Sequence, residues 1–190
     1  MNSEEIQKIV EVIEDSNLST FEVIRLIKNS GQSKSLVNVA EEIKLVIDYN
    51  QTIGQAITRG NYKWRNVDIT VKNFPTSREV IGRKVEAFTK LFYFGYNISS
   101  EDVISKMDKD GYRPAMLMEL LVLGFLFPGL QRRHSIVALG SIWQDAEGHP
   151  FAPCLDTYNS ERGLELYASA LNWRGYCFLG VLKSPAILAA

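Results

Sequence analysis

The spacing of hydrophobic residues predicts helices in the first third of the chain. Hydrophobic residues recur at helical intervals over residues 6–13, which indicates a short amphipathic helix. Ser19 precedes Glu22 in a capping-box pattern, which predicts the start of a second helix. A third helix is predicted at about residues 35–59. Together these elements define an N-terminal helical region over residues 1–60.

The third predicted helix carries a heptad-like seam, whose members alternate steps of four and three residues. They are Leu36, Ala40, Ile43, Ile47, Asn50, Gly54 and Ile57. A polar member such as Asn50 can set the register between packed helices, so this region could tether the protein or join copies into a homo-oligomer. A plain helical bundle would show much the same spacing, and Gly54 weakens the coiled-coil interpretation.

Beyond Gly60 the pattern of residues changes. Residues 66–71 alternate polar and β-branched side chains and are followed by Pro75, which predicts a strand that stops there. Helices are then predicted at residues 76–92, 99–111 and 114–127.

The last two of these helices have clear boundary signals. Ser99, followed by Asp102, is a helix start, and Gly111 is a helix stop. Pro114 suits the first turn of the apolar helix that follows, and Pro128 ends that helix.

From Ser135 onward the signals are for strands. They are predicted at residues 135–143, 151–156, 162–166 and 176–183. A turn at residues 146–150 and a polar loop at residues 157–161 separate the first three. Helices followed by a run of short strands predict an α+β fold.

Composition and charge fit a soluble globular domain. Hydrophobic residues make up 46% and charged residues 23% of the chain, and the net charge is -1. No basic excess points to nucleic acid, so no nucleic-acid partner is expected. The apolar run at residues 116–127 contains Glu119 and is too short for a membrane helix, and the N-terminus lacks a signal-peptide core. A reduced, buried pair is the simpler interpretation of Cys154 and Cys177, although one disulfide is possible.

The residues by themselves offer no credible active site. His134 and His149 are the only histidines, and neither belongs to a ligand pair with the spacing of a zinc site, although Asp145 and Cys154 lie near His149 in sequence. The basic cluster at residues 132–134 is more typical of a solvated surface than of a phosphate clamp. No glycine-rich phosphate loop is present, so neither a cofactor nor a metal is expected.

The last third of the chain resembles a known family. The segment "RPAMLMELLVLGFLFPGLQRRHSIVALGSIW", followed by "PCLD", "RGLEL", Trp173 and "FLGVLK", is similar to the variable proteins of diversity-generating retroelements, above all those of archaea, their viruses and candidate-phylum bacteria. The resemblance implies a C-type lectin-like ligand-binding domain of short, mixed antiparallel strands and flanking helices over residues 61–190. It also implies a variable region at about residues 156–177.

In that family, an error-prone reverse transcriptase rewrites codons at template adenines. The resulting codons encode Tyr, Ser, Asn, Gly or Arg, among others, but not Lys, Glu, Gln, Met or Trp. The residues of this region that cannot be reached fall where a framework is expected, and they are Glu161, Glu165, Trp173 and Lys183. The framework would be stabilised by burial of Ile136, Val137, Leu139, Ile142, Trp143, Leu164, Leu166, Phe178, Leu179 and Val181.

The resemblance assigns ligand contact to positions between these framework residues. They are Tyr158, Asn159, Tyr167, Ser169, Leu171, Asn172, Arg174 and Tyr176. Tyrosine with small polar residues is also the composition of adaptable binding surfaces. Cys177 stands where many relatives have arginine and could itself be a rewritten codon. Residues 143–145 read Trp-Gln-Asp in place of the Trp-Asn-Asp of calcium-dependent lectins, so no calcium site is expected.

The resemblance implies a non-enzymatic binding protein, cytoplasmic or virion-associated. Its partner would be a protein or cell-surface ligand that differs between sibling sequences, and its N-terminal helices would multiply weak contacts through avidity. Two alternatives remain open. One is an enzyme or defence factor with a cleft between the helical and lectin-like parts. The other is a structural assembly protein, which predicts that residues 167–176 are buried.

Overall fold

The computed structural model describes residues 42–170 and 172–183, which belong to one compact unit, Asn38–Ala190. The helices predicted at residues 6–13 and from Ser19 lie outside the described residues, as do Leu36 and Ala40 of the seam.

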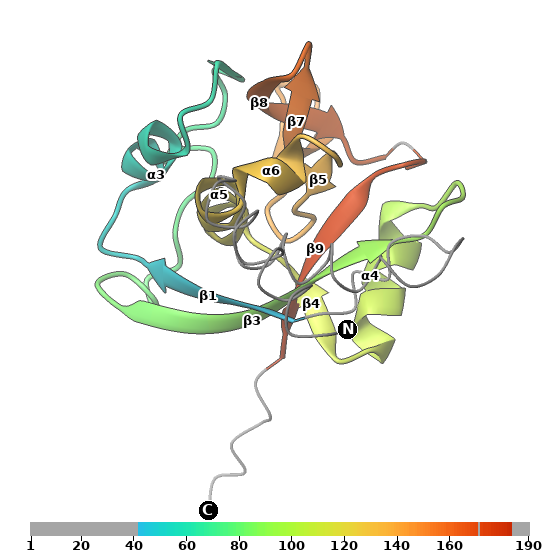
Figure 1. The fold of residues 1–190 in the computed structure, drawn as a ribbon, viewed down its shortest axis with the longest axis horizontal. Helices are drawn as coiled ribbons and strands as arrows, with labels where there is room; N and C mark the ends of the chain where they lie inside the picture. Colours follow the sequence, from blue (N-terminus) through green and yellow to red (C-terminus); the bar gives the residue numbers. More distant parts are fainter. Residues whose placement is uncertain (1–41, 171, 184–190) are drawn as a thin grey trace, which may run out of the picture. The chain divides into compact units, whose positions relative to one another are not determined.

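One mixed sheet with few helices forms the described unit, which confirms the predicted α+β class (Figure 1). Its strands are β1 (Ile43–Asp48), β2 (Trp64–Arg65), β3 (Lys84–Tyr93), β4 (Tyr112–Pro114), β5 (Ile136–Val137), β6 (Trp143–Gln144), β7 (Pro150–Tyr158), β8 (Glu161–Ala168) and β9 (Cys177–Leu182). Its helices are α3 (Ile53–Gly60), α4 (Ser100–Lys109), α5 (Leu117–Leu126) and α6 (Pro128–Gln131). The strand order is β1-β3-β9-β5-β7-β8-β2, with β4 paired to β9 and β6 to β7. Pairing is antiparallel except between β5 and β9 and between β2 and β8.

The helix predicted at residues 35–59 is wrong over its middle part. Ile43, Leu45 and Ile47 are buried and alternate with exposed neighbours, as in a strand with one face in the core. A step of four residues returns to the same face in a strand as well as in a helix, so Ile43 and Ile47 fit both patterns. β1 lies within the predicted N-terminal region of residues 1–60. Because it pairs with β3, it belongs to the same sheet as the predicted domain of residues 61–190.

The helical interpretation holds only for the end of that segment. Thr52 caps α3, since its Oγ1 accepts from the backbone N–H of Gln55 at 3.2 Å and the Gln55 side chain accepts from the Thr52 N–H at 2.8 Å. Asn50 lies in the turn before this cap and hydrogen-bonds to Asp48, so it sets no helix register.

Two further predicted elements are corrected between β2 and α4. Residues 66–71 form turns in place of a strand, and residues 84–92 of the predicted helix form most of β3. β3 pairs with both β1 and β9, so its β-branched and aromatic side chains pack on strand neighbours that overrule the helical spacing.

The later elements follow the predictions more closely. Ser99 caps α4, because its Oγ accepts from the Asp102 N–H at 3.1 Å. Pro114 ends β4 instead of opening the apolar helix, which begins at Leu117. Pro128 follows α5 and opens the short α6.

The predicted strands after Ser135 are largely confirmed. The strand at residues 135–143 is present only as β5 and β6, whereas β7 and β8 extend further than expected. They form a hairpin whose turn is Asn159–Ser160, with φ of 49° and 64°. Two consecutive residues at positive φ match the right-handed twist of the paired strands.

Most of the predicted framework is buried. Ile136, Val137, Leu139, Leu164, Phe178, Leu179 and Val181 are all 4% exposed or less. Trp143 and Leu166 are half-buried, and Ile142 is 43% exposed, so it does not belong to the core. α5, the apolar run at residues 116–127, packs on α3, β1 and β7, as expected of a core helix.

Both cysteines are buried, and neither forms a disulfide. Cys154 pairs with Val137 of β5, and Cys177 pairs with Ile136 of the same strand from its other side. Two strand spacings give a Cα separation of roughly 10 Å, beyond the reach of a disulfide. Cys177 is therefore a core residue in this structure.

Arg162 joins the β7–β8 hairpin to the helical layer. Its Nη1 donates to the carbonyl of Gly60 at 2.7 Å, and its Nη2 donates to the carbonyl of Gly124. Both carbonyls belong to the last turn of a helix, α3 or α5, where they have no partner within the helix and where a cation is favoured. The guanidinium also lies 4.9 Å from the Tyr62 ring, which an added Cβ at Gly60 or Gly124 would displace.

Gln131 completes this network. Its Oε1 accepts from Nε of Arg162 at 3.0 Å, and its Nε2 donates to the carbonyls of Asp156 and Gly163. Its own carbonyl accepts from the hydroxyl of Thr157 at 2.9 Å. The amide is 1% exposed, so both strands of the hairpin are bound to α6 through a dry contact.

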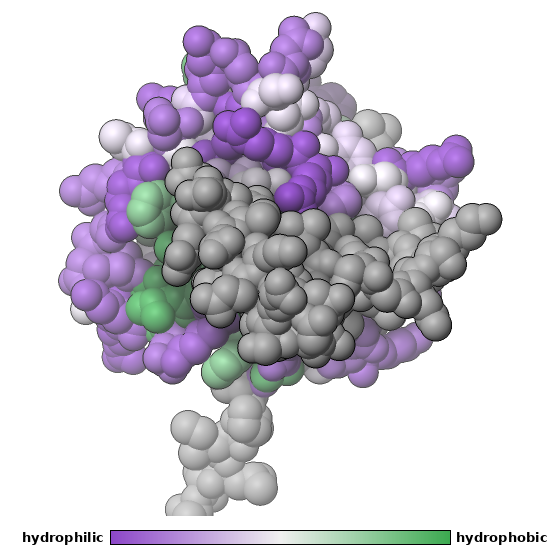
Figure 2. Space-filling view, in the orientation of Figure 1, coloured by the Kyte–Doolittle hydropathy of each residue, from purple (hydrophilic) through white to green (hydrophobic). Residues whose placement is uncertain are grey.

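The described residues contain no helix long and apolar enough to cross a membrane. Among the residues that Figure 2 colours, most are hydrophilic, and the hydrophobic ones gather in small areas.

Arg162→Met should lower the free energy of unfolding by about 3 kcal/mol, because two helix-end carbonyls and the Gln131 amide lose a charged donor. Arg65→Met is the matched control on the neighbouring strand, since Arg65 is exposed, and it should change stability by no more than about 0.5 kcal/mol. Urea unfolding measures both. Equal midpoints for Arg162→Met and the wild type would contradict this role of Arg162.

Candidate functional site

The β7–β8 hairpin presents its tip to solvent. Tyr158 ends β7 and is 72% exposed, and Asn159 is the exposed first residue of the turn. The strands behind them are tied to α6 through Gln131. The tip is therefore an exposed loop on a rigid support, which is the usual setting of a binding residue.

Asp156, Tyr158 and Tyr167 share one face of the hairpin. Asp156 pairs with Gly163 and Ala152 pairs with Tyr167, so alternation along both strands places these side chains on the same side. The hydroxyl of Tyr167 donates to Oδ2 of Asp156, while Oδ1 accepts from the Ser135 hydroxyl at 2.7 Å. Burial, followed by the hydrogen bond to Asp156, raises the pKa of Tyr167 above that of an exposed tyrosine.

A cluster of aromatic rings continues this face. The Tyr167 and Tyr176 rings meet edge to face with centroids 5.7 Å apart, and Tyr176 meets Trp173 in the same way at 5.1 Å. Tyr167 and Tyr176 are half-buried and pack against the core cluster that contains Trp173 and Phe178. Burial raises the pKa of Tyr176 as well.

Trp173 anchors the segment between β8 and β9. It is 3% exposed, and its Nε1 donates to the Ser100 hydroxyl at 2.8 Å. Ser100 in turn donates to the carbonyl of Ser169 at 2.6 Å. Trp173 and Ile98 exchange two backbone hydrogen bonds, of 3.1 and 2.8 Å. These contacts fix the segment to the first turn of α4 and to Ile98, which lies two residues before that helix.

Exposed residues stand on either side of this anchor. Asn172 and Arg174 are exposed. Ser169 is 7% exposed, and its hydroxyl donates to the Pro150 carbonyl at 3.3 Å. Leu171 lies outside the described residues. The structure thus brings Tyr167, Tyr176 and Asp156 together, and it places Tyr158 and Asn159 at the tip of the same hairpin.

Trp64 is a further member of this surface that the sequence analysis missed. β2 pairs with β8 in parallel, and Trp64 lies opposite Gly163. A Cβ built on Gly163 would overlap the indole ring, so the ring lies over this glycine on the face that carries Asp156 and Tyr167. Nothing in the sequence links position 64 to position 163, because the pairing depends on the tertiary fold. We call Trp64, Asp156, Tyr158, Tyr167 and Tyr176 the aromatic face.

The turn between β6 and β7 is the single cluster of metal-ligand type among the described residues. Oδ1 of Asp145 accepts from the backbone of Glu147 and of His149, and its Oδ2 lies 3.1 Å from Nδ1 of His149. These bonds close a tight turn, and Glu147 and His149 are exposed. The hydrogen bonds of Asp145 account for the conformation of this turn, and no ion is needed to explain it.

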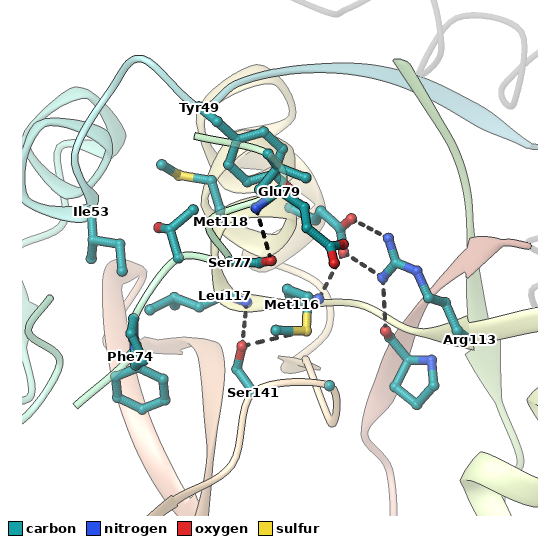
Figure 3. Close-up of a pocket in the computed structure, with 16 residues that line it drawn as sticks. Tyr49, Ile53, Phe74, Ser77, Glu79, Arg113, Met116, Leu117, Met118 and Ser141 are labelled. Carbon is teal, nitrogen blue, oxygen red and sulfur yellow. Dashed lines mark hydrogen bonds and ion pairs between the residues drawn. The ribbon is translucent and has the colours of Figure 1, made fainter. Parts of the chain in front are cut away.

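A pocket of about 500 Å³ opens beside the start of α5 (Figure 3). Its walls come from α3, from the loop at residues 74–80, from the end of β4 and from Ser141. It shares no residue with the aromatic face. Figure 3 shows Ile53 and Phe74 at one side and Arg113 at the other.

Comparison with protein-family models, with curated proteins and with solved structures finds no match for this chain. The C-type lectin-like fold and the retroelement family therefore stay predictions.

Removing Trp173 should be far more damaging than removing Tyr158. Trp173→Ala leaves a cavity in the core and should lower the free energy of unfolding by about 3–5 kcal/mol. Tyr158→Ala removes an exposed ring and should change it by no more than about 0.5 kcal/mol. Guanidinium unfolding of the two variants gives the comparison, and similar losses would show that the tip supports the fold.

Tyr167 should make stability fall at alkaline pH. Its pKa is raised in the folded state, so the unfolded chain releases this proton first and the free energy of unfolding declines above the ordinary tyrosine pKa of about 10. Tyr167→Phe should reduce that decline without removing it, because burial also raises the pKa of Tyr49 and of Tyr62, each to about 12. Urea unfolding between about pH 8 and pH 11 measures the slope, and an unchanged slope would contradict the assignment.

Proposed function

We propose that this protein is a non-enzymatic binding protein on a C-type lectin-like scaffold, and that a retroelement diversifies its surface positions between residues 156 and 177. The observation that carries the proposal is the alternation around Trp173. Asn172 and Arg174 are exposed, whereas the residue between them is buried and hydrogen-bonded to α4. Such an arrangement allows neighbouring positions to change while the backbone stays in place.

The composition of the surface supports a binding role. Tyrosine and tryptophan provide large contact area with few rotatable bonds, and asparagine and serine provide adaptable hydrogen bonds. Tyr158 is free to change its contacts at the tip, whereas Tyr167 is held by Asp156. A ligand would thus meet one ordered and one adaptable tyrosine on the same hairpin.

The partner would be a protein or cell-surface ligand, different for each sibling sequence. Contact through a few small, changing side chains gives modest affinity, so several copies acting together would bind more firmly. The predicted N-terminal helices would supply that multiplicity by tethering or oligomerisation. The protein would act in the cytoplasm or on a virion.

The gene neighbourhood tests the retroelement part. We expect a reverse-transcriptase gene beside a near-copy of the segment that encodes residues 156–177, with differences at adenines. Among sibling genes, changes should concentrate at the exposed positions, which are Tyr158, Asn159, Asn172 and Arg174. Trp173, Ser100 and Arg162 should stay constant, because they hold the hairpin and the anchored segment. Silent and missense changes scattered over the whole gene would overturn the proposal.

A further inference from the structure

The pocket beside α5 has the make-up of a small-molecule site. Its volume of about 500 Å³ falls within the range of ligand pockets, which are mainly apolar with a few placed polar groups. Ile53 and Phe74 form an apolar end, and Met116 and Met118 line the pocket with flexible thioether side chains. Methionines adapt to ligands of irregular shape.

The polar end of the pocket carries a balanced ion pair. Arg113 donates from Nη2 to Glu119 at 2.6 Å and from Nη1 at 3.0 Å, and Nη1 also donates to the Pro114 carbonyl. The Glu119 carboxylate is 2% exposed, and it also accepts from the backbone N–H of Met116 at 2.7 Å. Its charge is therefore fully compensated by groups of the protein.

Arg113 retains the capacity to bind a further acceptor. A guanidinium has five N–H groups, of which three are used in the bonds to Glu119 and Pro114. The other two have no hydrogen-bond partner among the described residues, and the side chain is 43% exposed. The half-buried Tyr49 lines the pocket as well.

The outer wall of the pocket is lightly held. Ser77, Glu79 and Val80 line it, and their backbone hydrogen bonds stay within the loop or reach Arg83. The next ties to the rest of the fold both go to Tyr49: its carbonyl lies 3.4 Å from the N–H of Gly82, and its N–H donates to the Arg83 carbonyl at 2.9 Å. A loop with so few hydrogen bonds to the rest of the fold can move to admit a ligand.

We propose that this pocket binds a neutral small molecule with an apolar body and a hydrogen-bond acceptor such as a carbonyl, with the acceptor toward Arg113. The charged residues that line the pocket indicate that its ligand is neutral. An anionic head group would find the Arg113 cation already paired with Glu119, and a cationic one would find only the exposed carboxylate of Glu79. Burying an unpaired charge is costly, whereas a neutral acceptor needs only the two remaining N–H groups.

The test uses two fluorescent probes that share one aromatic scaffold. 6-Propionyl-2-(dimethylamino)naphthalene is neutral and carries a ketone carbonyl as the acceptor, and 8-anilinonaphthalene-1-sulfonate carries an anionic sulfonate on the same naphthalene ring system. The neutral probe should bind the full chain with a fluorescence increase that saturates at one equivalent, and the anionic probe should bind at least about tenfold more weakly. Equal or tighter binding of the sulfonate would overturn the ligand class.

Variants locate the binding. Val80→Trp and Ser77→Trp each fill the pocket from its outer loop and should weaken binding of the neutral probe at least about tenfold. Val67→Trp is the matched control, because Val67 is 84% exposed and does not line the pocket. It should bind the probe as the wild type does. Thermal unfolding verifies that all of these variants fold, and unchanged binding by either wall variant would place the probe elsewhere and overturn the proposal.

This outcome is independent of the proposed function, because no pocket residue belongs to the aromatic face. Loss of probe binding in the wall variants would leave the pattern of sibling sequences untouched. Scattered changes in sibling genes would likewise leave the pocket intact.

Discussion

The position of the hairpin depends on one cation between two helix ends. Arg162 donates to carbonyls at the ends of α3 and α5 and to the Gln131 amide, so three separate parts of the chain meet at one side chain. Each carbonyl belongs to a buried glycine and would otherwise lack a partner, which makes the cation hard to replace. The exposed residues at the tip contribute nothing to this junction. Stability and surface chemistry are thus assigned to different side chains of one hairpin.

The segment between β8 and β9 also has exposed residues that are held in place by a buried side chain. Among its described residues, Trp173 makes a β-bridge to Ile98, packs on Phe178 and Tyr176, and donates to Ser100. A large ring with one polar atom suits this task, because it fills volume and still satisfies its N–H group. The pocket beside α5 is built differently, from a buried ion pair and a loosely tied loop. The unit therefore combines a hairpin that is bound to the helices with a pocket whose outer loop makes few hydrogen bonds to the rest of the fold.

The sequence predicted the α+β class, α4 with its Ser99 cap, the core role of α5 and the existence of strands β7 and β8, because each has a strong local signal. It failed for β1 and β3. Both carry hydrophobic residues at steps of four, which suit either a helix or a strand, and only pairing between distant segments decides. Trp173 was correctly placed in the framework, whereas Trp64 was missed because it reaches the site through a parallel pairing of positions far apart in sequence. The pocket left no sequence signal, since its walls come from four separate segments.

The backbone conformation at the hairpin tip limits which side chains can occupy it. With Asn159 and Ser160 both in the left-handed region, β-branched side chains there would strain the turn, while Asn, Asp and Gly are readily accommodated. Rewriting an asparagine codon at its adenines yields Asn, Asp, Gly and Ser among its products. If a randomising process acted on these positions, many of its products would still close the turn, and the backbone conformation would exclude others before any ligand is bound.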